Sequence, residues 1–182
     1  MTLPRKLALQ QVNGSLELFN YPLNSVDEIR GPATKEELSI APQSNKSITF
    51  DHFNRSEVKF KTSSRAFSLE FQNSLGEHLN LILDGGTQKF ILDRSRSGKT
   101  SFDEDFAKNI QTMPVPDLPN GEYEVRILMD WSSVEIFINS GQYVMTAQIF
   151  PNEFYRTLLL SNPGDMELEL YEFTISLIKS IW

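Results

Sequence analysis

The chain has 182 residues and a mass of 20.8 kDa, and 40% of its residues are apolar, which suits one domain with a hydrophobic core and argues against wholesale disorder. Its 17 basic and 24 acidic residues give a net charge of −7, which disfavours nucleic acid and anionic membranes as partners because both bind clustered Lys and Arg. Cysteine is absent and the two histidines, His52 and His78, lie far apart, so we expect no disulfide, no thiolate or multi-histidine metal site, and no cofactor.

The first half of the chain alternates between apolar and polar residues. This period of two runs through residues 57–61, 66–71 and 79–83. Because successive side chains of a strand point to opposite faces of a sheet, each segment is predicted to be a strand with one apolar face. The sequences Asn73-Ser74-Leu75-Gly76 and Asp84-Gly85-Gly86-Thr87 are typical of the turns between such strands.

Residues 94–119 interrupt the strand pattern. They contain Gly98, an acidic run and the prolines Pro114, Pro116 and Pro119. Proline lacks a backbone donor and is kept out of sheet interiors, and loops of this length tend to be functional or packed as a cover. We therefore expect an irregular covering loop.

The second half returns to strands over residues 123–129, 134–138 and 143–149, with a turn at Asn139-Ser140-Gly141. Within 134–138, only Phe137 breaks the polar set of positions.

The last segment, residues 166–177, changes phase between Leu170 and Tyr171. A one-residue slip turns all later side chains to the opposite face, which predicts a β-bulge there or a strand that changes sheets. Many short strands with regular turns and no convincing helical periodicity indicate an all-β sandwich or barrel, and the long last strand favours a large sandwich. No apolar run approaches the roughly 18 residues of a membrane-spanning helix.

Two groups of carboxylates could in principle supply the pair that glycoside hydrolysis requires. Asp103-Glu104-Asp105 is more typical of a solvated loop, and Glu167 and Glu169 fit a solvent-facing row on one strand. Neither histidine accompanies a nucleophile motif, and no phosphate-binding glycine pattern precedes a helix. We expect no catalytic residue in this chain.

Aromatic rings are the remaining candidates for a binding site, because sugars stack on Trp and Tyr. Trp131 and Tyr143 are the candidates for this role, with Tyr155 and Trp182 as further rings. Trp131 shares the inward phase of Tyr123 if its strand continues that far, and core packing is then the better reading for both.

Four segments together resemble the C-terminal β-sandwich domain of glycoside hydrolase family 32, whose members cleave fructans and sucrose. They are Met1-Thr2-Leu3-Pro4-Arg5-Lys6-Leu7, Leu92-Asp93-Arg94-Ser95-Arg96-Ser97-Gly98, Asp130-Trp131-Ser132-Ser133-Val134-Glu135-Ile136-Phe137-Ile138-Asn139, and the hairpin arm from Gly141 to Pro151. Each segment alone is weakly specific, but their order and spacing cover essentially the whole chain.

The resemblance implies a two-sheet antiparallel β-sandwich of the lectin-like jelly-roll type, forming one domain over residues 1–182. It also implies a five-bladed propeller upstream in the same polypeptide, which holds the Asp nucleophile and Glu acid/base of a retaining double displacement. The propeller motifs W-M-N-D-P-N-G, R-D-P and E-C do not occur here, so no catalytic residue can be carried over. Because Met1 falls inside a family motif, it need not be an initiator. Levanases are usually exported and sugar-phosphate hydrolases cytoplasmic, so the resemblance leaves the compartment open.

The resemblance suggests a set of structural or interdomain anchors. They are Leu3, Pro4, Arg5, Arg94, Asp130 and Trp131. The leading hypothesis is a non-catalytic accessory domain that stabilises the propeller; the alternatives are a module that binds fructan and a free-standing interaction domain. An excised domain of this kind should expose an apolar patch and self-associate through it.

Overall fold

The computed structural model describes residues 3–106, 108, 110–118 and 121–179. In this part of the chain almost all regular structure is strand, and every strand pairing is antiparallel. The first six-stranded sheet has the order β12 (Tyr143–Gln148), β11 (Ser133–Ile138), β10 (Tyr123–Asp130), β5 (Ser56–Thr62), β14 (Leu168–Leu177), β3 (Glu36–Ile40). The second has the order β4 (Ser44–Thr49), β13 (Thr157–Asn162), β6 (Ala66–Gln72), β7 (His78–Asp84), β8 (Lys89–Arg96), β9 (Gln111–Pro114).

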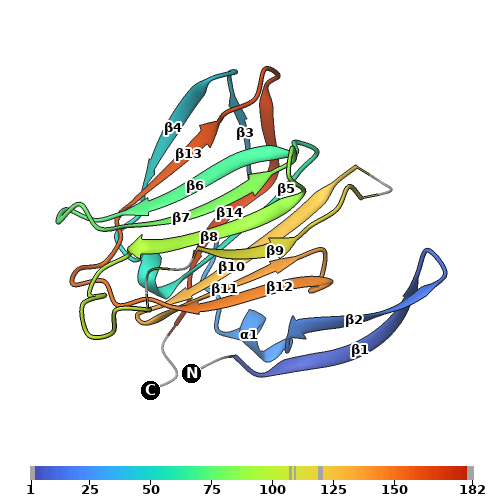
Figure 1. Ribbon diagram of the computed structural model, residues 1–182, viewed down its shortest axis with the longest axis horizontal. Helices are drawn as coiled ribbons and strands as arrows, with labels where there is room; N and C mark the ends of the chain where they lie inside the picture. The colour runs from blue at the N-terminus through green and yellow to red at the C-terminus, as the bar shows by residue number, and fades with distance from the viewer. Residues whose placement is uncertain (1–2, 107, 109, 119–120, 180–182) are drawn as a thin grey trace.

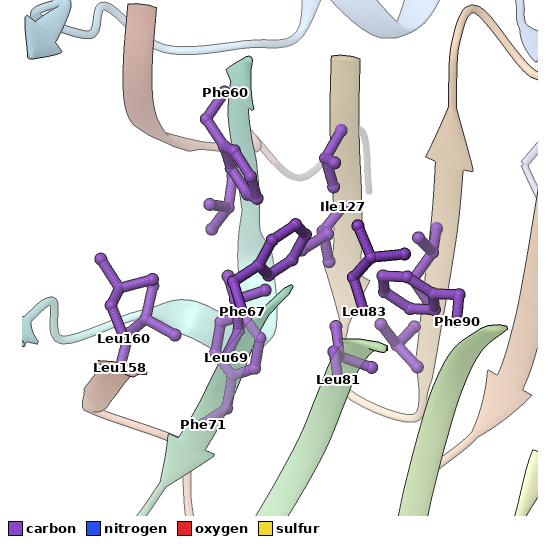
Figure 2. Close-up of a cluster of buried hydrophobic side chains, with 14 of the residues drawn as sticks. Phe60, Phe67, Leu69, Phe71, Leu81, Leu83, Phe90, Ile127, Leu158 and Leu160 are labelled. Carbon is purple, nitrogen blue, oxygen red and sulfur yellow. The ribbon is translucent and has the colours of Figure 1, made fainter. Parts of the chain in front are cut away.

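The two sheets form a β-sandwich, as the sequence predicts (Figure 1). Figure 2 shows the main core, where side chains of β6, β7, β8 and β13 meet those of β5 and β10. The alternation in β6 is reproduced in the structure, since Phe67, Leu69 and Phe71 are buried and the residues between them are half-buried. The period of two therefore places the apolar face of each strand between the sheets.

The predicted irregularity near Leu170–Tyr171 is confirmed as a β-bulge. In β14 the register with β3 shifts between Leu170 and Phe173, and the register with β5 shifts between Tyr171 and Thr174. Glu172 sits between these positions with a positive φ of 50°. The extra residue changes which side chains face the core, as the phase slip indicates.

Two expectations from the sequence are wrong in part. The segment 94–119 is not wholly irregular, because β8 continues to Arg96 and β9 forms a short edge strand that ends at Pro114, where a missing donor costs no ladder bond. Tyr123 is buried, as the alternation predicts. Its strand ends at Asp130, however, so Trp131 lies in a turn with 46% of its surface exposed.

The N-terminal part of the chain lies outside both sheets. β1 (Arg5–Val12) and β2 (Ser15–Pro22) form a two-stranded sheet, and α1 (Ser25–Glu28) follows it. This hairpin runs beside β12 and its tip extends away from the sandwich (Figure 1). The two helices of the described part, α1 and η1 (Phe53–Arg55), have four and three residues, and neither could span a membrane.

Candidate functional site

The outer face of the first sheet carries charged side chains that are buried. Glu57 on β5 has no exposed surface, and Arg126 on β10 and Glu135 on β11 are also buried. These residues occupy the polar phase of their strands, which normally faces solvent. They are buried because residues 3–30 cross this face and cover it.

The first group of charges centres on Glu57. Arg126 donates from Nε to Glu57 Oε1 at 2.6 Å, and Arg30 donates from Nη1 to Glu57 Oε2 at 2.9 Å. Arg126 also donates from Nη2 to Asp27 Oδ1 at 2.7 Å, and its guanidinium lies 5.2 Å from the centre of the Tyr21 ring. Burial disfavours the charged form of Arg126, but Glu57, Tyr21 and Asp27 together outweigh this effect and the pKa of Arg126 is raised. The group ties α1 and its flanks to β5 and β10.

The second group centres on Glu135. Arg5 donates from Nε at 3.2 Å and from Nη2 at 2.5 Å to Glu135 Oε2, and Nη2 also donates to Thr146 Oγ1 at 2.7 Å. The backbone N–H of Leu3 donates to Glu135 Oε1 at 2.8 Å. One carboxylate thus holds both Leu3 and the first residue of β1, with both guanidinium donors converging on one oxygen and the Leu3 N–H on the other. The Arg5 guanidinium also lies 5.0 Å from the centre of the Phe137 ring.

A small apolar cluster completes this covered face. Its buried members are Val26, Leu128 and Phe137, and Leu3, Tyr21, Val144 and Ile178 pack against them. Leu128 and Phe137 are apolar residues in the polar phase of β10 and β11. Apolar residues at these two positions indicate in the sequence that the outer face is covered. Nothing in the alternating pattern distinguishes Glu57, Arg126 and Glu135 from solvated residues.

The six predicted anchors fall into two separate places. Leu3, Pro4 and Arg5 lie on the covered outer face, where the Pro4 carbonyl accepts a hydrogen bond from Leu23 N–H. The remaining three, Arg94, Asp130 and Trp131, lie in or beside the loops that contact residues 148–154. The anchors therefore form no single surface, and their interdomain role stays a prediction.

Arg94 holds the loop that follows β8. It donates from Nη1 to the Gln148 carbonyl at 2.9 Å, and its guanidinium stacks 4.0 Å from the centre of the Phe106 ring. Phe102 and Phe150 complete this stack, with ring centres 4.7 Å and 5.5 Å from that of Phe106. Gly98 approaches the Phe150 carbonyl so closely that only glycine fits there. Burial lowers the pKa of Arg94.

The two candidate sugar-stacking rings lie at opposite ends of β11. Trp131 precedes the strand and meets Phe154 edge-to-face at 4.4 Å, and Asp130 accepts a hydrogen bond from its backbone N–H at 2.7 Å. Tyr143 pairs with Ile138 at the other end and is half-buried against the main core. They do not form one platform, and Trp182 lies outside the described residues.

The acidic candidates lie where the sequence predicts. Asp103, Glu104 and Asp105 are exposed, and Glu167 and Glu169 are exposed in or beside β14. Within the described residues, no three His, Asp or Glu side chains are grouped so that they could hold a metal ion.

Comparison with known proteins supplies the family. The profile described as "Glycosyl hydrolases family 32 C terminal" matches residues 25–176. The chain belongs to glycoside hydrolase family 32. It corresponds to the C-terminal domain, and the resemblance found in the sequence is confirmed.

Relatives in this family are much longer than the chain. The chain is 28% identical to a levanase of Bacillus subtilis over its whole length, and 31% identical over 96% of its length to an extracellular exo-inulinase of Aspergillus niger. It spans 27% and 34% of the length of these two proteins. The whole of the chain superimposes on the crystal structure of exo-inulinase from Aspergillus awamori, with a TM-score of 0.81 and 25% identity. The matched part is 36% of the exo-inulinase chain.

Proposed function

We propose that this chain is the non-catalytic C-terminal domain of a fructan- or sucrose-cleaving hydrolase, and that it stabilises an upstream catalytic propeller. The observation that carries the proposal is that the chain spans only about a quarter to a third of the relatives' length, and that residues 25–176 match the C-terminal family profile. The catalytic carboxylates of the parent enzyme would then lie in the part that is not included here.

The hydrogen bonds and ion pairs of the two buried carboxylates support this proposal. A retaining glycosidase needs two carboxyl groups about 5–5.5 Å apart, both open to the sugar. Glu57 is instead buried against Arg126 and Arg30, and Glu135 is buried against Arg5 and the Leu3 N–H. Their chemistry suits holding residues 3–30 on the sandwich, which is the segment through which an upstream domain is joined.

A direct assay tests the proposal. The purified 182-residue chain is incubated with sucrose, levan and inulin, and released fructose is measured. We expect none above a buffer control, and release by the chain itself would refute the non-catalytic role. In a second measurement, the longer polypeptide with and without residues 23–182 is heated, and loss of the domain is expected to lower the melting temperature of the catalytic part.

One observation favours a second function, binding of fructan by the domain itself. Trp131 is 46% exposed and is braced by the perpendicular Phe154 ring, so nearly half of its surface is available to a sugar ring. Isothermal titration calorimetry of the 182-residue chain with levan and with inulin would detect saturable binding. Trp131→Ala is expected to abolish any such binding, whereas Tyr143→Phe, at the other end of β11, is not.

A further inference from the structure

The β1–β2 hairpin, here called the N-terminal ribbon (residues 5–22), is a sheet of its own rather than part of the sandwich. Near its open end it is held by the Arg5–Glu135 pair. Farther along, Asn20 N–H donates to the Gly141 carbonyl at 2.9 Å, and Gln142 donates to Glu17 at 2.6 Å. The ribbon is thus fixed in position but shares no strand ladder with either six-stranded sheet.

The two faces of the ribbon differ sharply. Tyr21 and Glu17 lie on the face that contacts the sandwich, through Phe137 and Gln142. The register places four leucines on the opposite face, with 54% to 73% of their surface exposed: Leu7, Leu9, Leu16 and Leu18. Leucine side chains gathered on one face of a strand pair mark a buried sheet face, because each contributes roughly 1.5–3 kcal/mol when it is removed from water.

The outer edge of β1 is also unpaired in the described structure. The hydrogen bond from Leu23 N–H to the Pro4 carbonyl fixes the phase of the ladder, so Lys6, Ala8 and Gln10 bond to β2. The residues between them, including Leu7, Leu9 and Gln11, direct their N–H and C=O groups away from β2. The same phase directs Asn20 N–H outward on β2, where it reaches Gly141, so the free edge is that of β1. An edge with exposed leucines is a template for another strand.

We infer that the N-terminal ribbon belongs structurally to the upstream domain, where β1 adds as a strand to the edge of a β-sheet and the leucine face becomes part of that domain's core. This inference rests on the proposed function. The family profile for the C-terminal domain begins at residue 25, directly after the ribbon, whereas the levanase and exo-inulinase similarities include nearly all or all of the chain. The boundary between the two domains then lies near Leu23. The Arg5–Glu135 ion pair joins the two domains rather than fastening a tail, and the ion pairs of Arg126 with Glu57 and Asp27 lie within the C-terminal domain.

Hydrogen exchange measured residue by residue tests the strand addition. The 182-residue chain is compared with the longer polypeptide that includes the upstream domain. The outward amides of Leu7, Leu9 and Gln11 are expected to exchange about 100-fold or more slowly in the longer polypeptide, as amides of a paired strand do. The amides of Lys6 and Ala8, which are already bonded to β2, serve as the internal reference. Equal exchange of the outward amides in both proteins would overturn the inference.

A matched pair of variants tests the leucine face. Leu18→Lys in the longer polypeptide is expected to lower the melting temperature of the catalytic part, whereas Leu75→Lys, an equally exposed leucine in the turn after β6, is expected to leave it unchanged. Equal effects of the two would count against the inference. The inference would also be contradicted if the outward amides of the 182-residue chain became more protected as the protein concentration rises, because a second copy of the chain would then occupy the edge of β1. The fructose-release assay depends on neither result, so failure of the proposed function is recognised separately.

Discussion

Removing the negative charge of Glu57 is expected to destabilise the domain severely. The side chain has no exposed surface, and it accepts hydrogen bonds from both Arg126 and Arg30. In Glu57→Gln the shape is kept, but the buried Arg126 guanidinium retains only Asp27, which is itself partly exposed, as a charged partner. Arg30 loses less, because water screens its half-exposed guanidinium.

The cost follows from the buried position of the pair. Breaking a buried ion pair by removing one partner typically costs about 3–5 kcal/mol, and since Asp27 remains we expect about 3 kcal/mol. For a domain of this size that loss lowers the melting temperature by about 6–12 °C. Replacing both partners, in Glu57→Leu with Arg126→Met, removes the unpaired charge and is expected to recover most of the loss.

Urea denaturation of the 182-residue chain, followed by circular dichroism, measures these differences. Glu104→Gln is the matched control, because Glu104 also faces a cation, Lys108 at 3.4 Å, but on the surface. Its effect is expected to stay within about 0.5 kcal/mol. If Glu57→Gln were as mild as Glu104→Gln, or if the double variant were less stable than the single one, the reasoning on the buried network would be refuted.

Three further changes probe other parts of the molecule. Arg5→Met is expected to release the N-terminal ribbon, so limited proteolysis should cleave residues 3–22 faster while the sandwich core keeps its protection; unchanged cleavage would contradict the role of the Glu135 contact. Gly98→Ala would place a Cβ 2.1 Å from a backbone carbonyl oxygen at a residue whose φ is +135°, so it should lower the free energy of unfolding by about 3 kcal/mol. Gly76→Ala is the control: Gly76 also has a positive φ but open space around it, so the expected loss is about 1 kcal/mol. Hydrogen bonds and charge from two lysines lower the pKa of the exposed Glu172 to about 2. Its stabilising contribution is therefore present above its ordinary pKa of 4.5 and is lost as the pH falls toward 2. An NMR titration of Glu172 should give that low midpoint, and Lys35→Met should raise the midpoint.

The strands and turns of the sandwich were predictable because their signals are local. Alternation in residues 66–71 and 79–83 specifies a buried and an outward face for each strand, and Asp84-Gly85-Gly86-Thr87 specifies the turn after the second. The bulge near Leu170 was readable for the same reason, since a phase slip is a property of one segment. The sequence does not predict the short strand β9, because it is an edge strand and its Pro114 resembles the prolines of the loop that follows.

The candidate site was predicted only in part. Arg5 belongs to a family motif, but its partner Glu135 lies 130 residues later, in a segment whose pattern predicts only a strand. The end of β10 at Asp130 also decides that Trp131 faces solvent, which the alternating pattern did not indicate. Such facts depend on the pairing of distant segments, which no local pattern contains.

By itself the amino-acid sequence determined the all-β class, the inward face of most strands, the bulge and the family, because each depends on short-range periodicity or on a motif. Only the tertiary structure decided that Glu57, Arg126 and Glu135 are buried, because burial of a polar strand face depends on whether another segment crosses it. It also decided that the first strand has an open edge and an open leucine face, because an edge exists only once the neighbours of a strand are known.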